Sequence, residues 1–446
     1  MPICRTFLRR VFTALSVLSL CSSGYGQVPS PSTTTVVSKP LPIPTQIKKT
    51  VVFLRTDCLH DYTSEIDALT VESLLKLPPQ QRVAIAQNLA ALTSNLRTIT
   101  QIGSKLSAND LILIAQQVPP ADDQTAIANY IIQRGGMLVR MTSLTQKDLS
   151  EMKPAEIQRL PSDQHLGTGF LIALLDSRIA IPPGVNKSQL GFSYLVTNHH
   201  VVEPGVESGN PCPVLRRFVM LNHKPDSTHS SVYSEINRVD SLMHWSYPDD
   251  ESVDLAVTPI SVDENTYDST SISSQSFITE DEIQNKTVVE GDPVLFSGLF
   301  VQSFNENSVV DPIVRSGTLA MVPNALQTTT IKGLAGHIFL AEAHAFGGNS
   351  GSPMFIDTNK FAGVISGPSY KLLGVISGEV FENADMTFSV TTTTVNSSVH
   401  ANSDISMIVP ATELIKVLNK PELKLQRDSF LEKQKSVSPT IMPTAK

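Results

Sequence analysis

Short apolar runs, each ended by turn-forming residues, dominate the chain after Pro161 and most constrain its fold. Runs of this length that are rich in β-branched and aromatic residues are typical of strands, and their spacing favours an all-β sandwich or a pair of barrels. The runs lie at Phe170–Leu175, Phe192–Thr197, Arg217–Leu221, Leu255–Ile260, Val294–Ser297 and Lys371–Ile376. Residues 161–420 are therefore expected to form one β domain.

The N-terminal residues 1–26 have the order of a secretory signal peptide. Three arginines precede an apolar run over Val11–Cys21, and small residues follow up to Gly26, where cleavage is expected. The run is too short to span a bilayer comfortably. Leu20 stands where a lipid-modified Cys21 would need a small residue before it. We therefore expect an exported protein, periplasmic or secreted, without a stable membrane anchor.

Between the signal peptide and the β domain the composition changes twice. Residues 27–48 are rich in Pro, Ser and Thr, which indicates an extended linker. Residues 49–160 start with a strand-like run at Thr50–Leu54 and continue as apolar residues at helical spacing behind capping residues. A last helix is expected over Pro410–Leu418, and the polar remainder, residues 421–446, is expected to be disordered.

The charge of the chain excludes some partners. The formal net charge is −8, and loss of the signal peptide, with three arginines and no acid, would leave −11. An acidic exported protein is a poor candidate for binding nucleic acid or an anionic membrane surface.

Two of the four cysteines leave with the signal peptide, and Cys58 and Cys212 remain. In an oxidising compartment these two could form a disulfide, or each could be a separate buried thiol. Neither the cysteines nor the ten histidines show a metal-ligand spacing such as His-Glu-X-X-His. We expect no metal site and no cofactor.

Three stretches of the β region together supply the groups of nucleophilic acyl transfer. An apolar strand runs out into a polar turn at His199 and His200, Asp254 directly precedes an apolar run, and Ser350 lies among small residues over 347–353. A serine hydroxyl must lose its proton to attack a carbonyl, and histidine can accept that proton near neutral pH. A buried carboxylate can fix the imidazole and stabilise its charged form.

These motifs resemble those of the chymotrypsin-like (trypsin-fold) serine peptidases, and among them the bacterial HtrA-like peptidase domain. The resemblance covers Gly167 to Leu418 and rests on the segments 167–170, 196–202, 254–257 and 348–353, in the order His, Asp, Ser. It implies a mainly β fold of two six-stranded antiparallel β-barrels, to which the N-terminal helical module and a C-terminal helix are added. No PDZ module is expected after Leu418, because the remaining segment is short.

The resemblance also implies roles for single residues. Ser350 would be the nucleophile, His200 the general base and then acid, and Asp254 the carboxylate that orients it. The backbone N–H groups of Gly348 and Ser350 would form the oxyanion hole. His200 matches the motif because it directly precedes two valines, whereas His199 is expected to be a partly exposed turn residue.

Two neighbouring positions bear on activation and specificity. Asn349 stands where trypsin-type zymogens have an aspartate, so activation by a newly cut N-terminus is not expected. The pocket for the side chain before the scissile bond would be lined by His344, Ser377 and Gly378, with Glu379 at its wall. His344 is not the acid that selects Lys or Arg, so a trypsin-like preference is not expected.

The sequence therefore predicts an exported serine endopeptidase that acts on proteins or peptides. The alternative is a catalytically inactive trypsin-fold protein that serves as a binding scaffold. A lipase-like esterase fits less well, because Ser352 replaces the second glycine of a Gly-X-Ser-X-Gly elbow and the order of the three residues differs.

Overall fold

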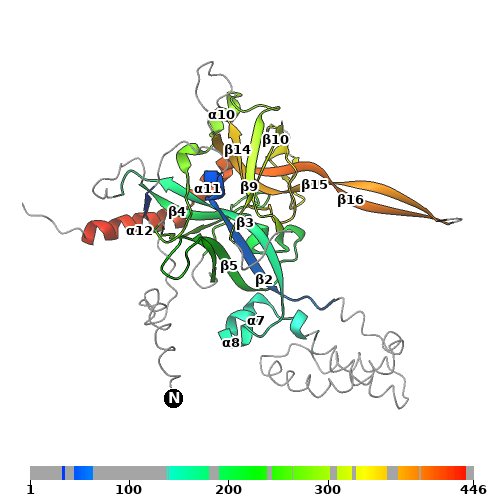
Figure 1. Ribbon diagram of the computed structural model, residues 1–446, viewed down its shortest axis with the longest axis horizontal. Helices are drawn as coiled ribbons and strands as arrows, with labels where there is room; N and C mark the ends of the chain where they lie inside the picture. Colours follow the sequence, from blue (N-terminus) through cyan, green and yellow to red (C-terminus); the bar gives the residue numbers. More distant parts are fainter. Residues whose placement is uncertain are drawn as a thin grey trace, which may run out of the picture.

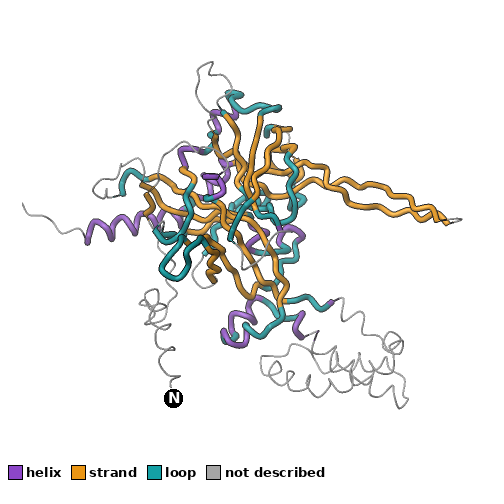
Figure 2. The backbone as a smooth tube through the Cα atoms, in the orientation of Figure 1, coloured by secondary structure: helices purple, strands orange, loops and turns teal. Residues whose placement is uncertain are grey.

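The computed structural model describes residues 33–35, 45–63, 138, 140–179, 190–238, 244–263, 265–301, 309–323, 328–358, 370–390 and 393–437. The predicted signal peptide and most of the predicted helical module, residues 64–137, lie outside the described residues. Figures 1 and 2 show the described chain as a mainly β structure with helices at its periphery.

Eight strands between residues 33 and 273 form one sheet. Six follow the order β1-β4-β3-β2-β5-β6, while β7 pairs with β4 and β8 pairs with β3. The β3–β8 pairing is parallel and the others are antiparallel. The strands are β1 (Thr33–Thr35), β2 (Val51–Leu59), β3 (Ser162–Leu175), β4 (Leu190–Thr197), β5 (Val214–His223), β6 (Tyr233–Arg238), β7 (Ala256–Pro259) and β8 (Ile272–Ser273).

Strand β3 is buried on both faces of this sheet, because apolar residues occupy both sets of alternating positions. Phe170 and Ile172 pack into a cluster that contains Tyr194. Leu171 packs on the opposite face with Val52. This double burial fixes the register of β3 against its neighbours, since a slip of one residue would exchange the two clusters.

Six strands from the C-terminal half close into an antiparallel barrel with the order β10-β13-β16-β15-β14-β9. Its core includes Phe296, Phe339, Met354 and Ile408. The strands are β9 (Pro293–Gly298), β10 (Ile313–Met321), β13 (Phe339–Glu342), β14 (Pro353–Asp357), β15 (Tyr370–Val390) and β16 (Thr393–Pro410).

Short elements connect these strands. They are the helices α1 (Thr45–Lys48), α7 (Gln146–Glu151), α8 (Pro154–Ile157), α9 (His199–Val202) and α10 (Glu280–Gln284), the 3₁₀ turns η2 (Val206–Ser208) and η3 (Ser274–Ser276), and a small sheet of β11 (Thr328–Thr329) with β12 (Ala335–Gly336).

The resemblance implied two six-stranded barrels, and the described residues contain one. The prediction of a mainly β fold with a six-stranded antiparallel barrel is confirmed. The N-terminal strands instead form a path from β1 to β6 that does not close within the described part of the chain. There β7 and β8 add to β4 and β3 as branches of the sheet and do not complete a ring.

Strands β15 and β16 continue beyond the barrel as a two-stranded hairpin that projects from the body in Figures 1 and 2. Strand β14 pairs with β15 only between Tyr370 and Val375, whereas β15 and β16 pair as far as Val390 and Thr393. We call residues 377–390 and 393–404 the arm. The run that the sequence predicted at Lys371–Ile376 is therefore only the first part of β15.

The described end of the helical module is attached to the N-terminal sheet. Leu149 and Leu160 share a buried cluster with Leu215 of β5. The Gln146 amide donates to the Val214 carbonyl at 3.2 Å and accepts the Val214 N–H at 2.8 Å. These contacts fix α7 against one edge of β5.

The C-terminal segment forms two helices, α11 (Ala411–Leu418) and α12 (Pro421–Val437). Helix α11 coincides with the expected final helix. The expectation of a disordered tail from residue 421 needs correction, because α12 covers most of it. Leu423 and Leu431 of α12 join the core cluster of the sheet, and the buried Arg427 donates to the Tyr194 hydroxyl and the Leu418 carbonyl, both at 2.8 Å. Within the described residues, no helix combines the length and apolar character needed to cross a membrane.

Replacing Arg427 with Met should lower the free energy of unfolding by about 1–3 kcal/mol, because the buried Tyr194 hydroxyl and Leu418 carbonyl would lose their donor. Urea denaturation measures this change. The matched control is Asp428→Ala on the same helix, which removes only an exposed 2.8 Å contact with Arg178 and should cost less than about 0.5 kcal/mol. Equal losses in the two variants would contradict this role of Arg427.

Candidate active site

His200 lies on α9, directly after the buried strand β4. The side chain of Asn198, the fully buried N-cap residue, donates from Nδ2 to the Asp254 carbonyl at 2.7 Å. The Thr197 hydroxyl donates to the Thr168 carbonyl of β3 at 2.6 Å. These two bonds hold the turn between β4 and α9, and so fix the backbone position of His200.

Asp254 lies two residues before β7, and its side chain is 1% exposed. Its Oδ2 lies 2.6 Å from His200 Nδ1, and its Oδ1 accepts the backbone N–H of His200 at 3.2 Å. A carboxylate can only accept these bonds, so Nδ1 carries the proton and Nε2 is left to accept another one. The pair therefore has the geometry of a base and the group that orients it.

The same contact sets the charges of the pair. Burial favours the neutral imidazole, but the Asp254 charge and hydrogen bond outweigh it and raise the pKa of His200. Burial likewise works against the Asp254 anion, and the His200 charge and hydrogen bond more than compensate, so the pKa of Asp254 is lowered. The charge of Glu207 acts to raise the pKa of His200, and that of Lys332 acts to lower it.

Ser350 lies in the turn that precedes β14, and Thr168 ties this turn to the sheet. The Thr168 N–H donates to the Ser350 carbonyl at 2.9 Å, and its hydroxyl donates to the Gly348 carbonyl at 2.7 Å. The same hydroxyl accepts the Leu299 N–H at 2.9 Å. One threonine of β3 thus links the Ser350 turn to the end of β9.

The buried Asn349 braces this turn from within. Its Nδ2 donates to the Leu299 carbonyl at 2.5 Å, and its Oδ1 accepts the Phe346 N–H at 2.8 Å. The sequence indicated only that Asn349 could not serve as a zymogen aspartate. The structure adds that its amide, which donates and accepts at once, holds the turn in place.

Two positions of this turn require glycine. The φ angle is +92° at Gly348 and +87° at Gly351, in the region that other residues avoid. A Cβ at Gly351 would also lie 1.9 Å from the Thr168 carbonyl oxygen. Substitution at Gly351 would therefore push Ser350 away from β3.

The backbone N–H groups of the turn fall into two sets. Those of Asn349, Gly351 and Ser352 donate to carbonyls at 2.8–2.9 Å. Those of Gly348 and Ser350 have no acceptor among the described residues. The two free donors are the ones that the sequence assigned to an oxyanion hole.

One cavity of about 390 Å³ is lined by His200, Gly348 and Ser350, together with apolar groups of Leu166 and Val301. The structure thus brings the three predicted catalytic residues to one place, with Asp254 behind His200. Ser350 and His200 are not hydrogen-bonded to each other, and the Ser350 hydroxyl has no partner within the described chain.

His199 belongs to a separate network behind the His200–Asp254 pair. Its ring stacks on Tyr247 with centroids 4.0 Å apart, and its Nε2 lies 3.2 Å from Glu203. The Tyr247 hydroxyl donates to Glu203 at 2.7 Å. The His199 hydrogen bond is the main cause that lowers the pKa of Glu203 to about 2. The side chain of His199 is 16% exposed, so the expected turn residue is also a packing residue.

Lys332, on the turn between β11 and β12, is a charged neighbour that sequence reasoning missed. Its Nζ lies 3.4 Å from both the Val253 carbonyl and His199 Nδ1. Its charge also acts on Asp254 and His200. No sequence motif predicts this contact, because Lys332 lies far along the chain from His199 and Val253.

The predicted specificity residues do not line the cavity that contains Ser350. His344 Nδ1 is hydrogen-bonded to Asp404 Oδ1, and its ring meets Phe346 edge to face at 4.4 Å. The buried Ser377 donates to the Met407 carbonyl at 3.3 Å. Both side chains are therefore hydrogen-bonded within the protein. The sequence did not indicate Asp404 as the partner of His344.

Beside these residues lie Gly378 and Glu379. The Ile331 side chain covers Gly378, since a Cβ there would lie 2.6 Å from Ile331 Cδ1. Glu379 is hydrogen-bonded to Asn402, and burial raises the pKa of its carboxyl group.

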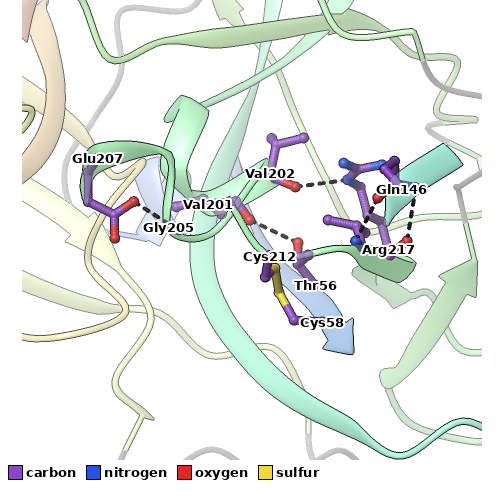
Figure 3. Close-up of a disulfide and its surroundings, with 10 residues drawn as sticks. Thr56, Cys58, Gln146, Val201, Val202, Gly205, Glu207, Cys212 and Arg217 are labelled. Atoms are coloured by element: carbon purple, nitrogen blue, oxygen red, sulfur yellow. Dashed lines mark hydrogen bonds between the residues drawn. A yellow bond between two sulfur atoms is a disulfide. The ribbon is translucent and has the colours of Figure 1, made fainter. Parts of the chain in front are cut away.

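Cys58 and Cys212 form a disulfide in the structure (Figure 3). It joins the end of β2 to the segment between η2 and β5. Two further bonds tie α9 to the same sheet, from Thr56 Oγ1 to the Val201 carbonyl at 2.8 Å and from Arg217 Nε to the Val202 carbonyl at 2.9 Å. These two bonds attach α9 to β2 and β5.

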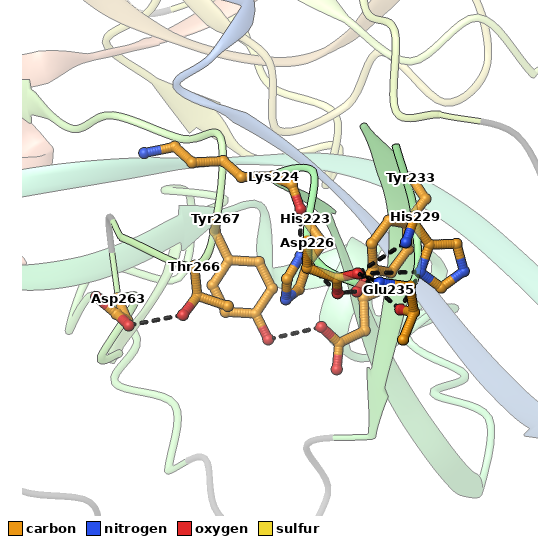
Figure 4. Close-up of polar contacts among 10 residues, drawn as sticks. His223, Lys224, Asp226, His229, Tyr233, Glu235, Asp263, Thr266 and Tyr267 are labelled. Atoms are coloured by element: carbon orange, nitrogen blue, oxygen red, sulfur yellow. Dashed lines mark hydrogen bonds and ion pairs between the residues drawn. The ribbon is translucent and has the colours of Figure 1, made fainter. Parts of the chain in front are cut away.

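Figure 4 shows a second cluster of titratable residues, at the β5–β6 hairpin. The His223 ring stacks on Tyr233 at 4.7 Å, and Tyr233 donates to Asp226 at 3.0 Å. Burial and a 2.9 Å bond to Glu235 raise the pKa of Tyr267 to about 12. These groups satisfy one another, and in the described part of the chain no set of His, Cys, Asp or Glu side chains could hold a metal ion.

Comparisons with known proteins give little further guidance. No protein-family model and no curated protein matches the chain. Among solved structures, it is similar to the inactive form of the Rv3671c protease, with 15% identity, coverage of 57% of this chain and 82% of that chain, and a TM-score of 0.28. A serine-to-alanine mutant of Rv3671c from M. tuberculosis H37Rv gives 14% identity, 57% and 80% coverage, and the same TM-score. A TM-score this low does not establish a shared fold.

The His200–Asp254 contact predicts a pH window of stabilisation. The lowered pKa of Asp254 stabilises the fold above the unfolded value of about 4, and this contribution is lost as the pH falls through the folded pKa. The raised pKa of His200 stabilises the fold below the unfolded value of about 6.5, and this contribution is lost as the pH rises through the folded pKa. The two contributions coincide between about pH 4 and pH 6.5.

Asp254→Asn should therefore lower the free energy of unfolding most within that window, by about 1–3 kcal/mol, and less at about pH 9. Urea denaturation of both proteins across the pH range measures the difference. A difference that does not depend on pH, or that grows toward alkaline pH, would contradict the ion pair.

Proposed function

We propose that this chain is an exported serine endopeptidase that hydrolyses peptide bonds through an acyl-enzyme. The observation that carries the proposal is the contact of His200 with the buried Asp254 carboxylate, in a cavity that Ser350 also lines. We further propose that the sheet, with His200 and Asp254, and the barrel, with Ser350, correspond to the two halves of a trypsin-like, HtrA-like peptidase domain.

In the first step, the Ser350 hydroxyl would attack the carbonyl carbon of the substrate while His200 Nε2 takes its proton. Asp254 would stabilise the imidazolium that forms, without taking the proton itself. His200 would then protonate the leaving amine. Water would repeat the sequence on the acyl-enzyme and release the acid product.

The free N–H groups of Gly348 and Ser350 suit the oxyanion of both tetrahedral intermediates. They need no rearrangement of a protein acceptor before they bind the developing charge. Thr168 and Asn349 hold the turn that carries them, and so support the same step without touching the substrate.

One observation favours a second candidate, an inactive protein that uses this fold as a binding scaffold. Ser350 and His200 share a cavity without a hydrogen bond between them. Such bonds are often long in proteins without substrate and tighten when substrate binds, so the peptidase remains the better supported function.

A fluorophosphonate probe tests the proposal, because it labels only an activated serine. The wild-type protein should be labelled, and Ser350→Ala should abolish labelling. Ser352→Ala is the matched control, because this buried hydroxyl has no hydrogen-bond partner among the described residues and lies outside the cavity. His200→Ala should slow labelling by about 10³-fold or more. Failure to label wild-type protein, with Ser352→Ala equally inert, would favour the scaffold.

The residues proposed for specificity, which do not line the cavity of Ser350, predict no preference for a basic residue before the scissile bond. His344 is hydrogen-bonded to Asp404 and Asn402 to Glu379, so a Lys or Arg side chain would compete with these contacts for either carboxylate. Cleavage of a peptide library randomised at this position should show basic residues at or below their frequency in the library. Dominant cleavage after Arg or Lys would contradict these roles of His344 and Asn402.

A further inference from the structure

A small hairpin brings a lysine to the His200–Asp254 pair. Lys332 lies in the turn that joins β11 to β12. Two backbone bonds close this turn, from the Thr330 N–H to the Leu334 carbonyl at 2.8 Å and from the Gly333 N–H to the Thr330 carbonyl at 2.9 Å. Lys332 therefore lies in a closed turn of defined conformation.

This turn packs against the segments around the candidate site. The Ile331 side chain lies on β15, since a Cβ at Gly378 would come within 2.6 Å of its Cδ1. A Cβ at Gly336 of β12 would lie 3.0 Å from the Oγ of Ser252, two residues before Asp254. These close approaches leave the turn little freedom to move relative to Asp254.

Two contacts at 3.4 Å orient the ammonium group of the half-buried Lys332. It donates to the carbonyl of Val253, the residue directly before Asp254. It also lies against His199 Nδ1. Because an ammonium group can only donate, Nδ1 accepts there, and the ring proton of His199 lies on Nε2, which faces Glu203. The charge of Lys332 is thus held beside the Asp254 segment.

Two side chains therefore hold the backbone that carries Asp254, and only one of them is charged. Asn198 donates to the Asp254 carbonyl at 2.7 Å, and Lys332 donates to the carbonyl before it. An uncharged donor at the position of Lys332 would lose less hydration when half-buried. The charge at this position therefore indicates a role beyond holding the backbone.

The charge acts in one direction on the pair. Burial lowers and Asp254 raises the pKa of His200, with a raised pKa as the net result, and the Lys332 charge opposes that rise. Burial raises and His200 lowers the pKa of Asp254, and Lys332 adds to the lowering. A nearby cation disfavours an imidazolium and favours a carboxylate. With Lys332 in place, His200 loses its proton at lower pH while Asp254 stays charged.

Other titratable groups surround the pair and Lys332. Those in the described part of the chain are His165 and Glu207 at the cavity, and His199, Glu203 and Tyr247 around Lys332. The charge of Glu207 acts on His200 in the opposite sense to that of Lys332. Lys332 does not line the cavity of Ser350. Its replacement would therefore change the charge at His200 without changing the surface that a substrate meets.

We propose that Lys332 is a positioning residue of the proposed peptidase. Its bond to Val253 holds the backbone that presents Asp254, and its charge keeps His200 free to accept the Ser350 proton at lower pH than the pair alone would allow. This role rests on the proposed function for the proton transfer. The effect on His200 exists in the folded protein with or without catalysis.

The pH dependence of fluorophosphonate labelling tests the role of the charge. Labelling needs unprotonated His200, so its rate should rise with pH to a plateau. Lys332→Met should move this rise to higher pH, which slows labelling by about 3- to 10-fold on the rising part and by less than about 2-fold on the plateau. Lys332→Arg keeps the charge and should follow the wild-type profile. A wild-type profile for Lys332→Met, or a slowing that is equal at all pH values, would overturn the proposal.

Two further variants separate the charge from the structure. Lys332→Gln carries an amide donor without the charge and should shift the profile as Lys332→Met does, and it replaces that variant if Lys332→Met does not fold. Lys424→Met removes the same charge from an exposed position on α12 and should leave the profile unchanged. Equal shifts in Lys332→Met and Lys424→Met would assign the effect to the net charge of the protein and overturn the role of Lys332.

A measurement without turnover separates this proposal from the proposed function. In full-length Ser350→Ala protein, isotope-labelled histidine reports the protonation of His200 by NMR, and His200→Gln assigns the signal. The titration midpoint should lie at higher pH when Lys332→Met is added, and Lys332→Arg should keep the original midpoint. An unchanged midpoint overturns the role of Lys332, whether or not protein with Ser350 intact is labelled. A shifted midpoint in a protein that is never labelled overturns the peptidase and supports the effect of Lys332 on His200.

Discussion

The Asp254 carboxylate is the most demanding group in this structure, because an anion with 1% exposure is costly unless its environment compensates it. Most of the compensation comes from His200, since both its ring and its backbone N–H bond to the carboxylate, and the charge of Lys332 adds to it. That requirement fixes α9 against the start of β7. The Asn198 amide closes the same contact from the other side by its bond to the Asp254 carbonyl. The orientation of the candidate base is thus a consequence of burying the acid.

Thr168 links the sheet to the barrel by hydrogen bonds. It lies on β3, yet its backbone and hydroxyl bond to Ser350, Gly348 and Leu299, which belong to the Ser350 turn and the end of β9. The position of Ser350 relative to His200 therefore depends on Thr168, a residue that takes no part in the proposed chemistry. A site divided between two β regions needs such a link, because packing alone leaves the distance between them free to vary.

Local patterns in the sequence predicted those strands and site residues whose structure depends on their neighbours in the chain. Short apolar runs indicated the strands β2, β3, β4, β5, β7, β9 and β15, and the motifs around His200 and Ser350 indicated the candidate site. Contacts between distant segments could not be predicted in this way. Lys332 reaches the site from a turn between two short strands. Helix α12 packs on the sheet, where the buried Arg427 donates a hydrogen bond to the Tyr194 hydroxyl of β4. The polar composition of α12 predicted disorder. Its partner Tyr194 lies far from Arg427 in the sequence, so no local pattern indicated that the helix would be buried there.

Strand β15 connects the arm directly to the candidate site. Its first residues close the barrel, Ile376 anchors the Ser350 turn, and the following residues leave the barrel with β16. Bulges between Ile376 and Gly378 and between Glu379 and Phe381 mark this change, and Asp404 on β16 has a φ of +61° at the same level. Bulges bend and twist a strand and end its regular pairing. The irregularities therefore fall where β15 passes from a barrel wall to an open edge, beside the serine.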